Sequence, residues 1–291
     1  MRIGIFLNVC GTLPGKDVCV WGEEVVAADF TKYLRRHPKV EFVEYYGRQG
    51  TRKFDQAPKD LDVVIHLDPQ LPMDFSKCNV IQYEISDLYF GGFNYYDQYD
   101  WRFSYGRRFA DKPRACFFPT PADIEKFKPT GLPIAYDVVF AGNTVPGQEN
   151  YIEPVMKADK FRCGIFGCFS KQPVSHDELP RIYSTSKICL NRHRGDFIYF
   201  DMWSNRVVEV GACGGFMISD DIAVERDVFQ GNIVTTTGGD DVVDKVKYYL
   251  THEDERKDKA QKFMEIVRAN FSTEKAVEVQ MAKLLEITGK G

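Results

Sequence analysis

The stretch Ser186–Asp221, SKICLNRHRGDFIYFDMWSNRVVEVGACGGFMISDD, carries the most informative pattern in the chain. The apolar run Lys187–Leu190 is typical of a buried strand, and a basic, polar loop follows it. A helix is predicted to begin at Arg206 and to end before Gly214. The two glycines at 214 and 215 break the helix, and a second apolar strand, Phe216–Ser219, follows them. The order strand, basic loop, helix, glycines and strand indicates one unit of an α/β fold.

Arg206 and Glu209 are three positions apart in the predicted helix, so their side chains share one face near its N-terminus. The positive end of the helix dipole and an arginine both favour phosphate, and a carboxylate suits ribose hydroxyls. This pair therefore predicts a nucleotide site. The alternative is a Rossmann-like helix on which the two side chains form a surface ion pair.

The segment Arg206–Gly214, RVVEVGACG, followed by an apolar strand and Asp220-Asp221, resembles the donor-site signature of the GT-B glycosyltransferases. It is most similar to the CgeB-like spore-protein group and, more distantly, to the phage DNA β-glucosyltransferases. The resemblance implies an α/β fold of two Rossmann-like domains facing across a cleft. It also implies a nucleotide-sugar donor, which we take to be a UDP-sugar, and a ribose-binding role for Glu209.

The composition is that of a globular protein. The 291 residues are enough for one large or two medium domains, and 44% of them are hydrophobic. No apolar run has the length of a membrane span, the eight cysteines are scattered, and the N-terminus leads directly into a strand. We therefore expect a cytoplasmic protein, in the host cytoplasm if the chain is phage-encoded. The net charge of −4 argues against a dedicated nucleic-acid binder.

Short apolar strands alternate with helical segments along the chain, which is typical of doubly wound α/β sheets. Strands are expected at 2–9, 40–46, 61–67, 79–83, 115–118, 137–141, 161–166, 187–190, 216–219 and 232–235, and helices at 23–36, 151–157, 179–186, 241–250, 255–270 and 274–287. Prolines at 119, 121, 129 and 133 indicate a connector between domains. The chain is therefore divided into an acceptor-side domain, residues 1–133, and a nucleotide-sugar-binding domain, residues 134–273. The resemblance implies that the helix 274–287 packs back on the first domain.

A glycine turn ends the first strand of the second domain at Gly142, Asn143 and Thr144, and Gly167 ends the next strand. Bare backbone N–H groups in such turns suit phosphate, so these residues are candidates for donor binding. An ordinary strand-to-helix turn is the alternative. The phage enzymes have a phosphate-binding arginine after a similar turn, and no arginine stands at that distance here.

The basic loop Arg192, His193 and Arg194 follows another strand end. Its side chains could neutralise the diphosphate as the sugar departs. The alternative is a solvated loop.

Carboxylates that could take part in the reaction occur at three positions. Asp201 precedes Glu209 by eight residues, a spacing similar to that of the paired acidic residues in many retaining GT-B enzymes, although chance also explains it. Glu84 ends an apolar strand, where the phage enzymes carry their general base, and Asp87 is its nearest rival. Partial burial would raise the pKa of such a carboxyl and suit it to that task.

Basic side chains at Arg102, Arg107 and Arg108 lie among tyrosines and phenylalanines in the first domain. Cations interleaved with aromatic rings can hold phosphates and stack on bases, so we expect them to bind the acceptor. A solvated face over an aromatic core is the alternative. The resemblance and these clusters make a 5-hydroxymethylpyrimidine in phage-type DNA the leading acceptor, ahead of a cell-surface or spore-coat glycan.

A sugar-nucleotide epimerase and a non-catalytic nucleotide-sugar binder are alternatives of another class. No tightly bound cofactor is expected. No spacing of ligands requires a metal, although a divalent ion could assist through the diphosphate. The sugar, the nucleotide base, the stereochemical outcome and the oligomeric state are left open by the sequence.

Overall fold

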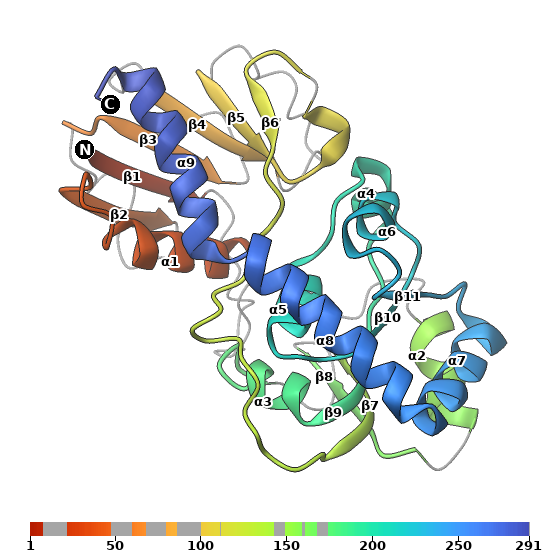
Figure 1. Cartoon of the computed structure of the whole chain (residues 1–291). Helices are drawn as coiled ribbons and strands as arrows, with labels where there is room; N and C mark the ends of the chain where they lie inside the picture. The colour runs from red at the N-terminus through yellow and green to blue at the C-terminus, as the bar shows by residue number, and fades with distance from the viewer. Residues whose placement is uncertain are drawn as a thin grey trace. The chain divides into compact units, whose positions relative to one another are not determined.

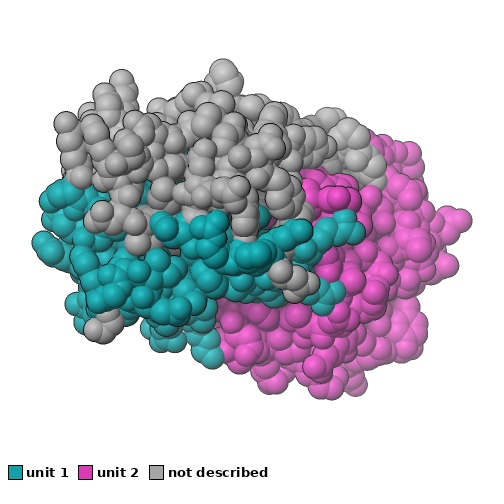
Figure 2. All heavy atoms as spheres, turned by 90° about the horizontal axis from the view of Figure 1, so that it is seen from above, with its two compact units in different colours: residues 1–14, 20–121, 273–291 teal, residues 15–19, 122–272 magenta. Residues whose placement is uncertain are grey.

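The computed structural model of the chain describes residues 1–7, 22–47, 60–67, 80–85, 100–110, 112–142, 149–158, 161–167 and 174–290. Among these residues the chain forms two compact units, drawn in two colours in Figure 2. Unit 1 runs from the N-terminus to Pro121 and takes up the chain again from Thr273, and unit 2 is Ala122–Ser272. The expected domain boundary at residue 133 therefore lies inside unit 2, because the units divide between Pro121 and Ala122, within the proline-rich connector.

Unit 1 is built on a six-stranded sheet in the order β2-β1-β3-β4-β5-β6, in which every neighbouring pair is parallel. Its strands are β1 (Arg2–Leu7), β2 (Phe42–Gly47), β3 (Val63–Leu67), β4 (Val80–Ile85), β5 (Trp101–Ser104) and β6 (Ala115–Phe117), and its helices are α1 (Gly22–Leu34), η3 (Arg107–Phe109, a 3-10 helix) and α9 (Thr273–Thr288). Strands buried on both faces, such as β3, require helices to cover them. In Figure 1 α1 and α9 lie side by side over this sheet.

Unit 2 is built on a five-stranded parallel sheet in the order β11-β10-β9-β7-β8. Its strands are β7 (Tyr136–Ala141), β8 (Cys163–Phe166), β9 (Ser186–Leu190), β10 (Met217–Ser219) and β11 (Val234–Thr235). Its helices are α2 (Glu149–Ala158), α3 (Leu179–Ser184), α4 (Gly195–Phe200), α5 (Asn205–Ala212), α6 (Ala223–Phe229), α7 (Gly239–Thr251) and α8 (Glu253–Asn270). Alternate side chains of β7, β9 and β10 pack with α2 and α7 in one apolar core.

Four short elements were not among the expected ones. Strand β5 and the 3-10 helix η3 lie in the aromatic segment, and helices α4 and α6 have only six and seven residues. Segments of this length carry too little periodicity to be distinguished from loops. Among the helices in the described part of the chain, none has both the length and the apolar character of a membrane span.

Candidate functional site

Arg206, at the start of α5, links the carboxyl ends of two neighbouring strands of unit 2. Its Nε donates to the carbonyl oxygen of Ala141 at the end of β7 (2.5 Å), and its Nη1 donates to Oδ1 of Asn191 just after β9 (2.6 Å). Its guanidinium also lies over the ring of Phe140, 4.6 Å from the centroid. Among the described residues, no carboxylate pairs with Arg206 and Nη2 has no acceptor. The edge where parallel strands end thus presents a fixed positive charge, as suits an anionic ligand.

The glycines at the ends of β7 and β8 make this arrangement possible. A Cβ on Gly142 would lie 1.8 Å from Nη2 of Arg206, so only glycine leaves room for the guanidinium. Gly167 has a φ of +143° and approaches Gly142 so closely that a Cβ would lie 2.1 Å from its carbonyl oxygen. Both glycines therefore shape the strand ends around Arg206. The expected phosphate turn continues into Asn143 and Thr144, which lie outside the described residues.

Glu209, one helical turn after Arg206, is buried, with only 5% of the residue exposed. Its Oε1 lies 3.0 Å from Nε2 of His176, and Nδ1 of the same ring lies 2.8 Å from Nζ of Lys126. Lys126 also donates to the carboxylate of Asp177 at 2.6 Å. The surface ion pair between Arg206 and Glu209, which was the alternative to a nucleotide site, is therefore not formed, because each side chain has other partners. Lys126 and His176 belong to no motif, so no pattern in the sequence indicates either residue.

Arg192 lies at the same edge of the sheet, after β9. Its Nη1 donates to Oδ2 of Asp220 (2.5 Å) and to the carbonyl oxygen of His193 (2.8 Å), and its guanidinium lies over the ring of Tyr151. Because Asp220 already offsets its charge, Arg192 offers less attraction to an anion than Arg206 does.

The side chain of His193 is fully buried between two carboxylates. Its Nδ1 lies 2.8 Å from Oδ1 of Asp220, and its Nε2 lies 3.0 Å from Oε1 of Glu225. Burial alone lowers the pKa of this imidazole, but the charges of Glu225 and Asp220 outweigh it and raise the pKa to about 9. Burial raises the pKa of Asp220, but its hydrogen bonds with His193 and the charges of His193 and Arg192 outweigh this and lower the pKa to about 2. With both ring nitrogens engaged inside the protein, His193 is not placed to bind a diphosphate, and that prediction is corrected.

Arg194 and Asp201 flank α4. The guanidinium of Arg194 forms a two-point ion pair with Asp196, through Nε to Oδ1 (3.2 Å) and Nη2 to Oδ2 (2.8 Å). Asp201 has a left-handed backbone (φ 54°), and its Oδ1 accepts from the backbone N–H of Val224 in the first turn of α6 (2.8 Å). These contacts give both residues a structural role, which no pattern in the sequence indicates.

Residues 146–282 match a family model described as glycosyl transferase-like. Three solved structures share the architecture over nearly the full chain. A glycosyltransferase from Rickettsia africae ESF-5 has a TM-score of 0.69 at 12% identity, covering 98% of each chain. The fold is GT-B. The sucrose-phosphate synthase of Thermosynechococcus elongatus has a TM-score of 0.67 at 12% identity, again over 98% of each chain. Alr3699/HepE of Anabaena, solved in complex with UDP-glucose, has a TM-score of 0.69 at 12% identity, over 97% of this chain and 99% of its own.

No curated protein matches the chain in sequence. The family match covers most of unit 2, where Arg206 and Glu209 lie. The chain therefore resembles glycosyltransferases in the sequence of residues 146–282 and in its fold.

In unit 1 of this GT-B chain, the residues expected to bind the acceptor differ in exposure. Arg102 is only 1% exposed, within β5, so the prediction that it binds an acceptor is wrong: a buried cation is not open to phosphates. Arg107 is half-buried and Arg108 is exposed, both on η3. Glu84 belongs to β4, where it stands opposite Leu67 in the register, but its side chain and the whole of Asp87 lie outside the described residues.

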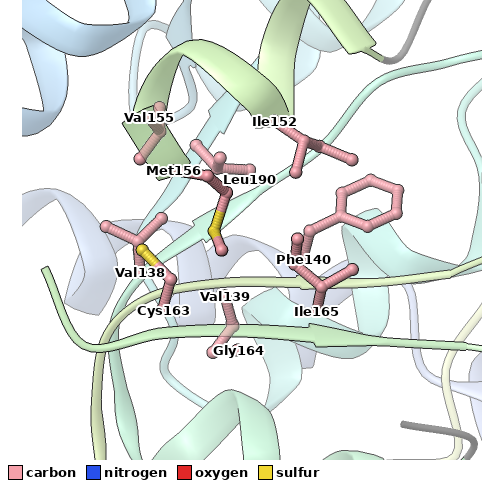
Figure 3. A pocket seen from close by; sticks show the side chains of 10 residues that line it. All are labelled: Val138, Val139, Phe140, Ile152, Val155, Met156, Cys163, Gly164, Ile165 and Leu190. Carbon is pink, nitrogen blue, oxygen red and sulfur yellow. The ribbon is translucent and has the colours of Figure 1, made fainter. Parts of the chain in front are cut away.

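An apolar pocket lies between α2 and the sheet of unit 2, drawn in Figure 3. Its lining consists of side chains from β7, β8, β9 and α2, with no charged group: Val138, Val139, Phe140, Ile152, Val155, Met156, Cys163, Gly164, Ile165 and Leu190. Such a lining offers no charged side chain to a diphosphate, so the pocket differs in chemistry from the sheet edge that carries Arg206.

Among the described residues no group of three His, Cys, Asp or Glu side chains could hold a metal.

Proposed function

We propose that the protein transfers a sugar from a UDP-sugar to an acceptor hydroxyl, with the donor bound by unit 2. The observation that carries the proposal is Arg206, a cation without a carboxylate partner among the described residues, held at the carboxyl ends of β7 and β9. Nucleotides bind at this edge of open α/β sheets. Arg206, helped by Arg192 and the backbone at Gly142, takes the diphosphate, and Glu209 takes the ribose.

The likeness to known proteins supports the choice of donor. Alr3699/HepE shares the fold over nearly its full length, and it was solved with UDP-glucose. The positive charge at Arg206 suits the leaving group, because negative charge gathers on the diphosphate as the bond to the sugar breaks.

Calorimetric titration of UDP and of uridine tests this assignment. Arg206→Ala should weaken the binding of UDP about 10- to 100-fold, which is the range for one charge-assisted hydrogen bond. It should leave the binding of uridine unchanged. Arg226→Ala is a matched control, because Arg226 is an exposed arginine of unit 2 paired with Asp221. Equal UDP affinity in the wild type and in Arg206→Ala, with the same fold in both, would remove the assignment.

For the reaction we propose Glu84 as general base. Its carboxylate takes the proton of the acceptor hydroxyl, the oxygen attacks the anomeric carbon, and the bond from that carbon to the diphosphate breaks with inversion. Asp87 is the rival base. A retaining reaction organised by Asp201 and Glu209 would need no protein base.

Glu84→Ala decides between these mechanisms. A base of this kind contributes about 10²-fold or more, so kcat should fall by at least that factor while UDP affinity stays the same. Turnover close to that of the wild type would favour the retaining alternative, and the anomeric configuration of the product, read by NMR, would settle it. Asp87→Ala is the companion variant.

For the acceptor we propose two candidates: a 5-hydroxymethylpyrimidine in DNA, and a cell-surface or spore-coat glycan. The burial of Arg102 weakens the argument for DNA, since one of the three arginines behind it is not exposed. Incubation with UDP-sugars, with and without each acceptor, followed by mass spectrometry of the products distinguishes them. An epimerase would convert the donor without an acceptor, and a binding protein would leave it intact.

A further inference from the structure

The carboxylate of Glu209 is held by side chains from two distant segments of unit 2. His176 precedes α3, and Lys126 lies in the connector after Ala122, yet both converge on α5. Within the described residues, Oε1 of Glu209 is engaged by His176, and Oε2 has no partner. A carboxylate with one oxygen engaged and the other open can accept from one further donor.

Lys126 fixes which nitrogen of His176 carries the proton. The ammonium of Lys126 can only donate, so Nδ1 of His176, 2.8 Å away, must accept. The proton of the neutral ring then sits on Nε2, which donates to Oε1 of Glu209 at 3.0 Å. The ring is also packed edge-on against Phe127, with centroids 5.2 Å apart. Its tautomer and its orientation are therefore both set by neighbours.

The backbone turns that present these two residues are themselves anchored. Glu178 accepts from the backbone N–H of Ser175 (3.0 Å) and from its hydroxyl (3.2 Å), which closes the turn that contains His176. Asp123 accepts from the backbone N–H groups of Glu125 and Lys126, which fixes the other turn. Residues without a catalytic motif are thus held firmly toward a single carboxylate.

We propose that His176 is a positioning residue for donor recognition: it holds Oε1 of Glu209 so that Oε2 is aimed at a ribose hydroxyl. The inference rests on the proposed function. It goes further in assigning ribose recognition to a Lys126–His176–Glu209 relay in which only Glu209 touches the nucleotide. A purely structural hydrogen bond would affect the fold, whereas a positioning bond affects binding only of ligands that carry the ribose hydroxyls.

Titration of UDP and of 2′,3′-dideoxy-UDP into the full-length protein separates the two roles. His176→Leu should reduce the affinity for UDP about tenfold, the effect of one lost hydrogen bond. It should reduce the affinity for the dideoxy ligand by less than about twofold. His176→Gln, which keeps an amide donor, should restore UDP affinity to within about threefold of the wild type. His252→Leu, at an exposed histidine between α7 and α8, should change the affinity for neither ligand.

Each other outcome has a definite meaning. Equal losses with both ligands, or no loss with either, would overturn the positioning role while leaving donor binding in place. Equal affinity of the wild type for UDP and the dideoxy ligand would show that no ribose hydroxyl is recognised, and the inference would fail by itself. Absence of UDP binding to the wild type would remove the proposed function and this inference together.

Discussion

At the scale of single residues, the two arginines of the candidate site differ in how much charge they can offer. Arg192 and Asp220 form an ion pair of 2.5 Å, whereas Arg206 contacts only a carbonyl oxygen and an amide oxygen among the described residues. Neutral oxygens orient a guanidinium without cancelling its charge. Gly142 belongs to the candidate site for a steric reason, because a Cβ there would lie 1.8 Å from Nη2 of Arg206.

Gly142→Ala should therefore act through Arg206. A methyl group at 1.8 Å from Nη2 must displace the guanidinium, so we expect UDP affinity to fall about as far as in Arg206→Ala, and the double variant to lose little more. Gly195→Ala is the matched control, because nothing lies within 4 Å of its added Cβ. Additive losses in the double variant, measured by calorimetry, would contradict the coupling.

His193 gives the protein a pH-dependent term in its stability. Its pKa of about 9 in the folded state is above the usual 6.5, so folding favours the imidazolium. The stabilisation is fully present below about pH 6.5 and is lost as the pH rises through about 9. It amounts to on the order of 3–4 kcal/mol, since the pKa rises from 6.5 to about 9 and one pKa unit corresponds to about 1.4 kcal/mol.

Urea unfolding between pH 6 and pH 10 measures this term. The free energy of unfolding of the wild type should fall over that range by more than that of His193→Gln, whose side chain does not titrate. His252→Gln, at an exposed histidine, should follow the wild type. Parallel curves for the wild type and His193→Gln would show that the imidazole is neutral in the fold.

At the scale of elements, short helices position the residues of the candidate site. Helix α4 begins directly after the basic loop, and its last turn leads into Asp201, whose carboxylate caps α6. Helix α5 then brings Arg206 to the strand ends and Glu209 to His176. Asp201 and Glu209 are eight residues apart, but they therefore belong to different elements and contact different partners.

Asp201→Ala tests whether the capping contact accounts for this residue. Loss of an N-terminal cap costs about 0.5–2 kcal/mol, and alanine also tolerates the left-handed backbone poorly, so thermal unfolding should shift downward. Asp201→Asn keeps the left-handed preference and should lose less stability. We expect kcat well below the melting temperature to change less than about threefold in both. A loss of 10²-fold in a folded variant would instead support the catalytic role expected from the spacing.

At the scale of the whole molecule, charge bears on the acceptor. The net charge is −4, and Arg102 is buried. Binding to duplex DNA through phosphates requires accessible cations and weakens steeply with salt.

The DNA option makes a direct prediction for Arg108, the exposed arginine of η3. If DNA is the acceptor, binding to hydroxymethylated duplex should fall at least tenfold between about 50 and 200 mM salt, and Arg108→Ala should reduce that slope. Fluorescence anisotropy with a labelled duplex measures both. Undetectable or salt-insensitive binding would leave the glycan as the acceptor to pursue.

The sequence by itself was sufficient for the α/β class and for most strands and long helices, because their apolar periodicity is local. It also placed Arg206 near the start of a helix and one turn before Glu209, because that spacing is local. Helices α4 and α6 were missed because six or seven residues leave no period to read.

Only the tertiary structure decided which side chains are open and which are engaged. Burial and pairing depend on segments far apart in the chain: Lys126 meets His176 across 50 positions, and His193 meets Asp220 across 27. No local pattern distinguishes the buried Arg102 from an exposed arginine, or a histidine that binds a ligand from one enclosed by carboxylates. Those distinctions arise when the sheet brings its strand ends together, which is a property of the fold.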